Sequence, residues 1–131
     1  MSYTIDFVPK DDHLHVTVSG DNNPETITNY LSDVLNTVRR DGQGLVLIEE
    51  NLLGPSMKIF DIFDIVTKAS ENINDTRIRI AYIDINKEHD RKGLQFAETV
   101  AQNRGINVKI FNDRASALRW LLNKNDPSAD R

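Results

Sequence analysis

The chain opens with two stretches in which apolar and polar residues alternate, which is the period of a half-buried strand. Tyr3 to Phe7 forms the first stretch and His13 to Val18 forms the second. Between them, Pro9 to Asp12 combines proline, lysine and two aspartates, a composition typical of a turn. The pattern therefore predicts that the two strands pair as an antiparallel hairpin.

Beyond residue 22 the apolar residues change to helical spacing. They recur on one stripe from Ile27 to Val38, and Arg39, Arg40 and Gly42 follow that stripe. Asn23 suits the N-cap and Pro24 suits the first helical position. We therefore expect a helix that begins at Pro24 and ends before Gly42.

The rest of the chain alternates between strand-like and helix-like segments. Strands are expected over 45–48, 77–84 and 108–110, and helices over 57–71, from about 86 to 104, and from 113 to 122. The whole order is strand, strand, helix, followed by three further strand–helix units. This order predicts an α/β fold with a mostly parallel five-stranded sheet and an antiparallel N-terminal edge strand.

Polar residues on alternate positions of the later strands suggest that one sheet face is wet. Arg77 to Tyr82 and Asn107 to Ile110 both alternate in this way. Right-handed crossovers between sequential strands place their helices on one side, so we expect single winding and no switch-point crevice. Ile83, Ile106 and Phe111 depart from this pattern, and a helix or a partner would have to cover them.

Composition and charge restrict the class of protein further. A chain of 131 residues has room for one domain, which we place at 1–122, with 123–131 as a flexible C-terminal tail. Sixteen Lys and Arg against twenty Asp and Glu disfavour nucleic acid as a partner, and there is no cysteine for disulfide or thiolate chemistry. The apolar run Leu45 to Ile48 is too short for membrane insertion, and the start lacks a leader pattern, so a cytoplasmic location is expected.

Three segments carry a resemblance to a known family. They are the strand at 79–84 (RIAYID), the segment at 96–111 (FAETVAQNRGINVKIF) and the ending at 117–122 (ALRWLL). Together with the element order, they resemble a bacterial STAS domain of the SpoIIAA-like group, which is related in fold to anti-sigma-factor antagonists and to SEC14-type lipid-binding domains. The resemblance implies a SpoIIAA-like single domain that is not catalytic and acts through protein contacts or a bound small apolar ligand.

The resemblance also points to a serine. In the signalling branch of the family, a partner kinase phosphorylates a Ser in an Asp-Ser-Ser/Thr-Gly motif at the start of the helix after the central strand. Ser56 occupies this position, although the preceding Asp and the following Gly of the motif are absent. Ser56 is therefore a candidate phospho-acceptor, and the alternative is a plain N-cap of the helix expected at 57–71.

The start of the same helix carries a candidate interface. Its expected buried stripe is Ile59, Ile62, Phe63, Val66 and Ala69. Residues off this stripe form an apolar patch edged by acid, and with the preceding loop glycine the candidate interface residues are Gly54, Met57, Phe60, Asp61 and Asp64. The alternative is that Phe60 packs against the first helix or the loop before it.

Histidine and carboxylate side chains of the strands are further candidate sites. His13 and His15 share a strand face, but no third ligand follows at a defined spacing, so we predict solvent-facing side chains and no metal site. Glu49, Glu50 and Asp84 lie at the carboxyl edge of the sheet and could serve acid–base chemistry if desolvated, although solvated strand ends or helix caps are expected. With no recognisable catalytic motif, we predict no catalytic residues and no cofactor.

Three hypotheses follow. The first is a cytoplasmic, non-enzymatic STAS-like regulatory module that contacts a protein partner, or a second copy, through the loop Glu49 to Pro55 and the start of the following helix. The second is a small carrier or sensor that binds an apolar ligand between the second helix and the sheet. The third is a small hydrolase-like enzyme that uses the carboxylates at the sheet edge.

Overall fold

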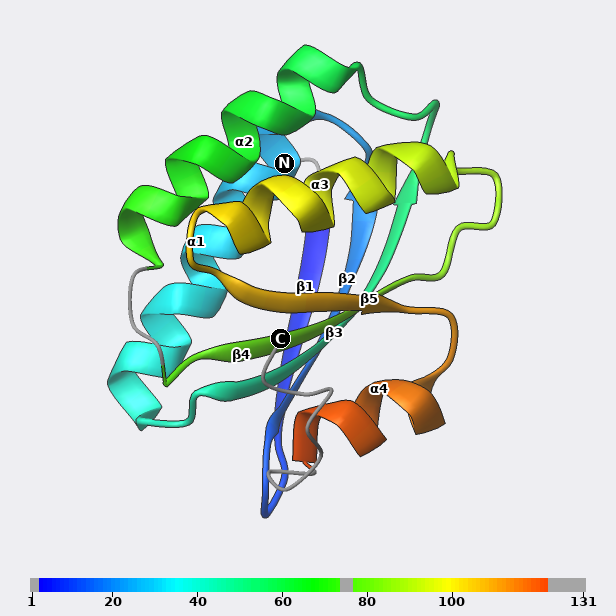
Figure 1. Cartoon of the computed structure of the whole chain (residues 1–131). Coiled ribbons are helices and arrows are strands. Elements are labelled where there is room, and N and C mark those ends of the chain that lie inside the picture. Colours follow the sequence, from blue (N-terminus) through cyan, green and yellow to red (C-terminus); the bar gives the residue numbers. More distant parts are fainter. Residues whose placement is uncertain (1–2, 74–76, 123–131) are drawn as a thin grey trace.

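The computed structural model describes residues 3–73 and 77–122 of the chain. These residues form alternating strands and helices around one sheet (Figure 1). The elements are β1 (Tyr3–Pro9), β2 (Leu14–Asp21), α1 (Pro24–Asp41), β3 (Leu45–Leu53), α2 (Ile59–Asn72), β4 (Arg79–Asp84), α3 (Arg91–Asn103), β5 (Asn107–Phe111) and α4 (Arg114–Leu122). The predicted C-terminal tail at 123–131 lies outside the described residues.

The sheet has the predicted topology. Its five strands lie in the order β1-β2-β3-β4-β5, with β1 antiparallel to β2 and every other pair parallel. The α/β prediction and the antiparallel N-terminal edge strand are therefore confirmed. The order of the strands does not reverse anywhere in the described sheet. This sheet therefore has no switch-point crevice that would indicate where a ligand binds.

Three helices cover one sheet face. The crossovers β2–α1–β3, β3–α2–β4 and β4–α3–β5 join sequential parallel strands, and right-handed connections place all three helices on the same side (Figure 1). The largest apolar cluster lies on this side, where side chains such as Val16, Ile48 and Ile80 meet Val34 of α1 and Ile65 of α2. We call this side of the sheet the three-helix face.

The opposite face is only partly wet, because α4 crosses it. Leu47, Ala81 and Ile83 of the sheet pack against Ala117 and Trp120 of α4 in a second, smaller cluster. The departures noted in the strand pattern are thereby explained: α4 covers Ile83 and Phe111, while Ile106 belongs to the three-helix face. We call this second side the α4 face.

Two helix starts differ from the prediction. The N-cap of α2 is Lys58, which makes no side-chain capping bond, so the prediction of Ser56 as the N-cap is wrong. α3 begins at Arg91 rather than near Asn86, and Asp90 caps it by accepting a bond from the Lys92 N–H at 2.9 Å. The reason is local: the Asn86 side chain accepts from the Glu88 N–H, a turn that competes with helix over 86–89.

Candidate functional site

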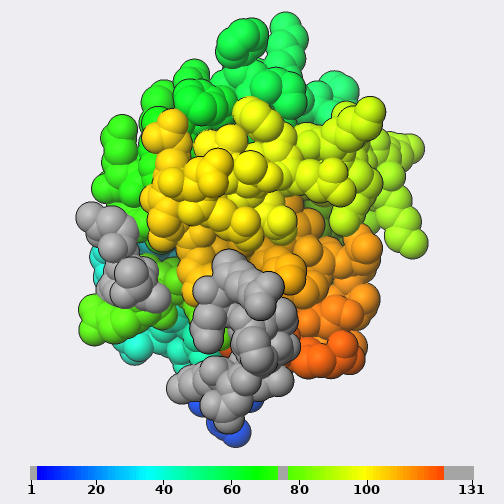
Figure 2. Space-filling view, viewed as in Figure 1, coloured from blue at the N-terminus to red at the C-terminus, as the bar shows by residue number. Residues whose placement is uncertain are grey.

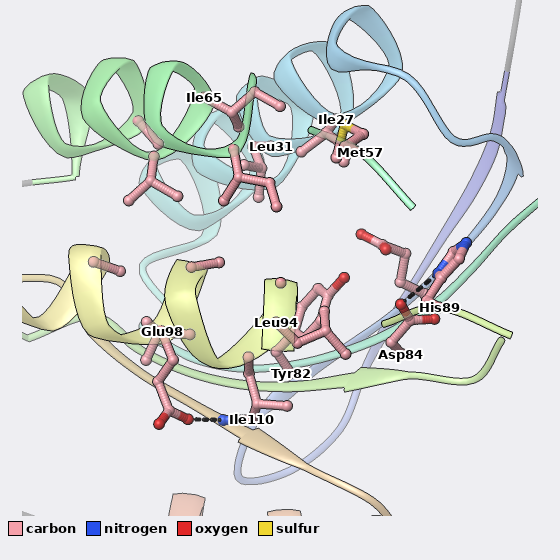
Figure 3. Close-up of a pocket in the computed structure, with 18 of the residues that line it drawn as sticks. Ile27, Leu31, Met57, Ile65, Tyr82, Asp84, His89, Leu94, Glu98 and Ile110 are labelled. Carbon is pink, nitrogen blue, oxygen red and sulfur yellow. Dashed lines mark hydrogen bonds and ion pairs between the residues drawn. The ribbon is translucent and has the colours of Figure 1, made fainter. Parts of the chain in front are cut away.

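A cavity of about 330 Å³ lies on the three-helix face, between the helices and the sheet. Apolar side chains from all three helices and from three strands make up most of its wall. Figure 3 shows Ile27 and Leu31 of α1 and Ile65 of α2 on one side of it, opposite Leu94 of α3 and Tyr82 of β4. From outside, α2 and α3 lie side by side (Figure 2), and both contribute to the wall of the cavity. A cavity of this volume and character is typical of a small-molecule site.

One end of the cavity is polar. Glu50 of β3 and Asp84 of β4 are neighbours in the parallel register, so both carboxyls reach the three-helix face at the carboxyl ends of their strands. Tyr30 of α1, Tyr82 of β4 and His89 before α3 complete what we call the polar cluster.

Glu50 is a deeply buried carboxyl of the polar cluster, with 2% of its surface exposed. The Tyr30 hydroxyl donates a hydrogen bond to its Oε2, and the Tyr82 hydroxyl bonds the same carboxyl. Burial raises the pKa of Glu50 to about 7 and outweighs the two tyrosine bonds, which lower it. The prediction that this carboxylate is a solvated strand end or a helix cap is therefore wrong.

His89 links the loop after β3 to the sheet through contacts of its two ring nitrogens. Its Nδ1 lies 2.6 Å from Asp84 Oδ2, and its Nε2 lies 3.1 Å from the Gly54 carbonyl oxygen (Figure 3 shows the Asp84 contact). Asn22 strengthens the same link by donating to the Pro55 carbonyl at 2.8 Å. Loop 54–56 is thus held directly beside the polar cluster.

The cavity reaches the surface next to this loop. Ser56, Lys58 and Asp90 all contribute to its wall and are all exposed. The Ser56 hydroxyl oxygen accepts a bond from the Asp90 N–H at 2.8 Å, so the serine joins the loop to the start of α3. The candidate phospho-acceptor therefore lies at the mouth of the cavity.

The predicted interface residues separate into two groups. Met57 is partly buried, packs against the core and contributes to the cavity wall. Phe60 is 84% exposed, Asp64 and Gly54 are also exposed, and Asp61 is partly buried. The alternative that Phe60 packs against the first helix or the loop is wrong, because its ring projects into solvent.

The buried stripe of α2 was predicted with a shifted phase. Ile62 and Ile65 are its buried residues, while Ile59 and Phe63 are 50% and 40% exposed. The Arg104 guanidinium lies 5.1 Å above the Phe63 ring. Sequence spacing alone could not set the phase here, since apolar residues occupy most faces of the first two turns.

Glu49 points away from the cavity, because successive residues of a strand face opposite sides. On the α4 face it pairs with His15 and with Arg114, whose Nη2 lies 2.8 Å from Glu49 Oε1. His13 is 7% exposed and bonds Asp12 at 2.7 Å, so the prediction of solvent-facing histidines is wrong. The three carboxylates predicted at one edge thus fall into two environments.

The sequence alone did not indicate that Tyr30, Tyr82 and His89 belong to the polar cluster. Tyr30 was recognised only as part of the apolar stripe of α1, and Tyr82 only as an apolar position of its strand. A buried tyrosine needs a hydrogen-bond partner for its hydroxyl. The carboxyls of Glu50 and Asp84 at the strand ends were available as partners, and this was the signal in the sequence. His89 carried no comparable signal, because the turn that brings it to Asp84 has no recognisable motif.

The part of the chain that the structure describes holds neither a candidate metal centre nor a candidate membrane span. Within residues 3–73 and 77–122, no group of three or more His, Asp or Glu side chains could hold a metal ion. The helices of that part of the chain are each too short or too polar to cross a bilayer.

Two solved structures are similar to this chain. A serine-to-glutamate variant of RsbS from Moorella thermoacetica aligns with a TM-score of 0.51 and 12% identity over 89% of this chain and 93% of its own. The solution structure of the protein TM1081 aligns with a TM-score of 0.45 and 16% identity over 90% and 88%. No protein-family model and no curated protein matches the sequence. The chain has the STAS or SpoIIAA-like fold, as the sequence resemblance implied.

Proposed function

We propose that this chain binds a small apolar molecule in the cavity and acts as a STAS-fold sensor or carrier without catalysis in the cytoplasm. The observation that supports the proposal is the cavity itself, about 330 Å³ of mostly apolar wall with one polar end. Burying the apolar surface of a ligand there would be favourable by roughly 25 cal/mol for each Å² removed from water.

The placement of the polar groups supports ligand binding over a packing defect. Small-molecule sites combine an apolar wall with a few convergent polar groups that orient the ligand. Here Tyr30, Glu50 and Tyr82 converge at one end, and exposed Ser56 and Lys58 lie at the mouth. A ligand could enter beside loop 54–56 with its apolar part under α2.

Thermal unfolding with decanol as the probe tests the proposal. A ligand at about 100 times its Kd stabilises the folded state by about 2.7 kcal/mol, which raises Tm by several degrees. Ala97→Phe places a ring in the cavity wall and should abolish this rise. Ala115→Phe, at an exposed position of α4, is the matched control and should keep it.

A second blocking variant keeps the test valid if Ala97→Phe fails to fold. Ala69→Leu narrows the cavity from α2 instead of from α3. Unchanged Tm of the wild-type protein with decanol would contradict the proposal, and so would an equal rise in every folded variant.

A regulatory contact with a protein is the second candidate function. It is favoured by the exposed apolar side chains at the start of α2, where Phe60 is 84% and Ile59 is 50% exposed. The proposed surface is the exposed part of the segment Glu49 to Pro55, which forms the end of β3 and the loop after it, together with Gly54, Met57, Phe60, Asp61 and Asp64. It would bind a protein partner or a second copy of the chain. The STAS-like fold supports a regulatory module of this kind.

Light scattering and a pull-down test this second candidate. Phe60→Ser should lower self-association or partner capture, because it removes an exposed ring from the proposed contact. Val8→Ser removes a half-exposed apolar side chain from the edge strand and is the control. Unchanged assembly of a folded Phe60→Ser variant would contradict it.

Ser56 provides a separate test of regulation. A phosphate at Ser56 would add negative charge at the cavity mouth, next to Asp90. If this serine is a switch, Ser56→Asp should change partner binding and Ser56→Ala should leave it near the wild-type level. Equal binding by both variants would contradict the switch.

A further inference from the structure

The polar end of the cavity has a charge character that restricts the ligand. Resting on the proposed function, we infer that the ligand is an apolar molecule with a protonated amine, and that this cation pairs with Glu50. Its apolar part would lie under α2 and α3, and its nitrogen would meet the carboxyl beside Tyr30 and Tyr82.

Glu50 is a buried carboxyl without a cationic partner in its bonds. Its hydrogen-bond partners are the Tyr30 and Tyr82 hydroxyls, which are neutral. A buried carboxylate is costly unless a positive charge compensates it. A ligand ammonium at this end of the cavity would supply that charge and several N–H donors in one group.

The other charged groups around the cavity disfavour an anionic ligand. The polar wall includes four carboxylates, those of Glu50, Asp84, Asp90 and Glu98. His89 is the partner of Asp84 at 2.6 Å, and Glu98 accepts a bond from the Ile110 N–H at 2.7 Å (Figure 3).

Positive charge is scarce in the same wall. Among the described residues that line the cavity, Lys58 is the only lysine or arginine, and it is exposed at the mouth. A fatty-acid carboxylate reaching the polar end would meet Glu50 and Asp84 without a lysine or arginine to pair with, and His89 there is already bonded to Asp84, so like-charge repulsion would oppose it.

The protonation state of Glu50 agrees with this inference. Burial raises its pKa to about 7, so near neutral pH the ligand-free carboxyl carries a proton part of the time. The ammonium group of the ligand would bind the deprotonated carboxylate, so the carboxyl must lose that proton on binding. Binding should therefore strengthen from about pH 6 to about pH 8. Tyr30 from α1, Tyr82 and Asp84 from β4, and His89 from the loop are the titratable groups that face Glu50.

Isothermal titration calorimetry with three probes of equal chain length tests the inference. Decylamine, decanol and decanoate share an apolar chain and differ in the head group. We expect decylamine to bind the wild-type protein roughly ten- to a hundredfold more tightly than decanol, with decanoate weakest. Glu50→Gln should remove most of the preference for decylamine over decanol. Glu71→Gln, at an exposed carboxyl of α2 outside the cavity, is the matched control and should behave as wild type.

The outcomes separate this inference from the proposed function. Equal binding of decylamine and decanol, or a preference that survives Glu50→Gln, overturns the amine and leaves the cavity as an apolar site. Tighter binding of decanoate also overturns it. Failure of all three probes to bind folded wild-type protein overturns the proposed function together with the inference. Ala97→Phe must abolish decylamine binding, since binding that survives it would lie elsewhere.

Discussion

The two faces of the sheet are filled in different ways. On the α4 face, Leu47, Ala81, Ala117 and Leu121 have no exposed surface, and Trp120 closes the cluster. On the three-helix face, the buried residues of α2 are only Ile62 and Ile65, which are 9% and 7% exposed, and a cavity remains beneath α2 and α3. One short helix thus leaves a tightly packed cluster, while three longer helices leave space.

The buried carboxyls on the two faces also differ in their hydrogen-bond partners. Glu49 on the α4 face has His15 and Arg114 as partners, whereas Glu50, the next residue, has only neutral hydroxyls in its bonds. Native proteins seldom leave both an apolar cavity and a buried acid without a cationic hydrogen-bond partner on one side. The comparison teaches that the small α4 face is packed without space, whereas the three-helix face holds the cavity in which we propose that a ligand binds.

Trp120→Ala should have the largest effect on stability. The Trp120 ring lies 5.6 Å from the Phe111 ring and 4.3 Å from the Arg79 guanidinium, in a cluster with no space to relax. We expect the free energy of unfolding to fall by about 3–5 kcal/mol in urea denaturation. Ile62→Ala, beside the existing cavity, should cost about 2 kcal/mol, the low end for such changes. A larger loss for Ile62→Ala would reverse the comparison.

Stability should depend on pH through Glu50. The folded-state pKa of about 7 lies above the ordinary value of 4.5, so the folded state holds the proton more tightly. The resulting stabilisation is complete below about pH 4.5 and is lost as the pH rises through about 7, on the order of 3 kcal/mol. Glu50→Gln should flatten the wild-type decline between these values in urea titrations. A decline of the same slope in the variant would exclude Glu50 as its source.

Gly93→Ala should stabilise the protein by about 0.5–1 kcal/mol. Gly93 lies within α3, and a Cβ there would meet only Ile62 Cδ1, at 3.4 Å. Alanine costs less backbone entropy than glycine in a helix, and the cavity leaves room for the methyl group. Gly44→Ala is the contrasting variant, because its Cβ would lie 2.6 Å from the Arg77 carbonyl oxygen and should destabilise the protein. Thermal denaturation that ranks the two in the opposite order would contradict this account of the packing.

Arg114→Ala should have the smallest effect. Its guanidinium pairs with Glu49 on the α4 face, but 59% of the arginine side chain is exposed. Pairs with this degree of solvent contact contribute about 0–1 kcal/mol. Chemical denaturation at low and high salt should therefore show a small loss that shrinks with salt. A loss of several kcal/mol would make this ion pair a main support of the α4 face.

Much of the fold could be predicted because its signals are local. Alternation at Tyr3 to Phe7 and helical spacing at Ile27 to Val38 each determine an element, and Asn23 caps α1 as expected by accepting from the Thr26 N–H. The strand order follows from the succession of elements and the handedness of crossovers. The phase of α2 could not be predicted, since Ile59 and Phe63 are as apolar as the buried Ile62 and Ile65.

The site was harder to predict than the fold. Glu50 and Asp84 were recognised at the sheet edge, yet their burial depends on how far β3 extends and on the helices above it. The apolar run predicted only residues 45–48, while β3 continues to Leu53 and carries Glu50 into the three-helix face. A cavity arises from the fit of distant side chains, so no sequence window contains it.

The most direct test of the ligand site is a crystal structure of the protein grown with decylamine. The account predicts density for the alkyl chain between α2, α3 and the sheet, with its nitrogen within hydrogen-bonding distance of the Glu50 carboxyl. Side chains from α2 and α3 filling that space, with decylamine absent or bound elsewhere on the molecule, would contradict it.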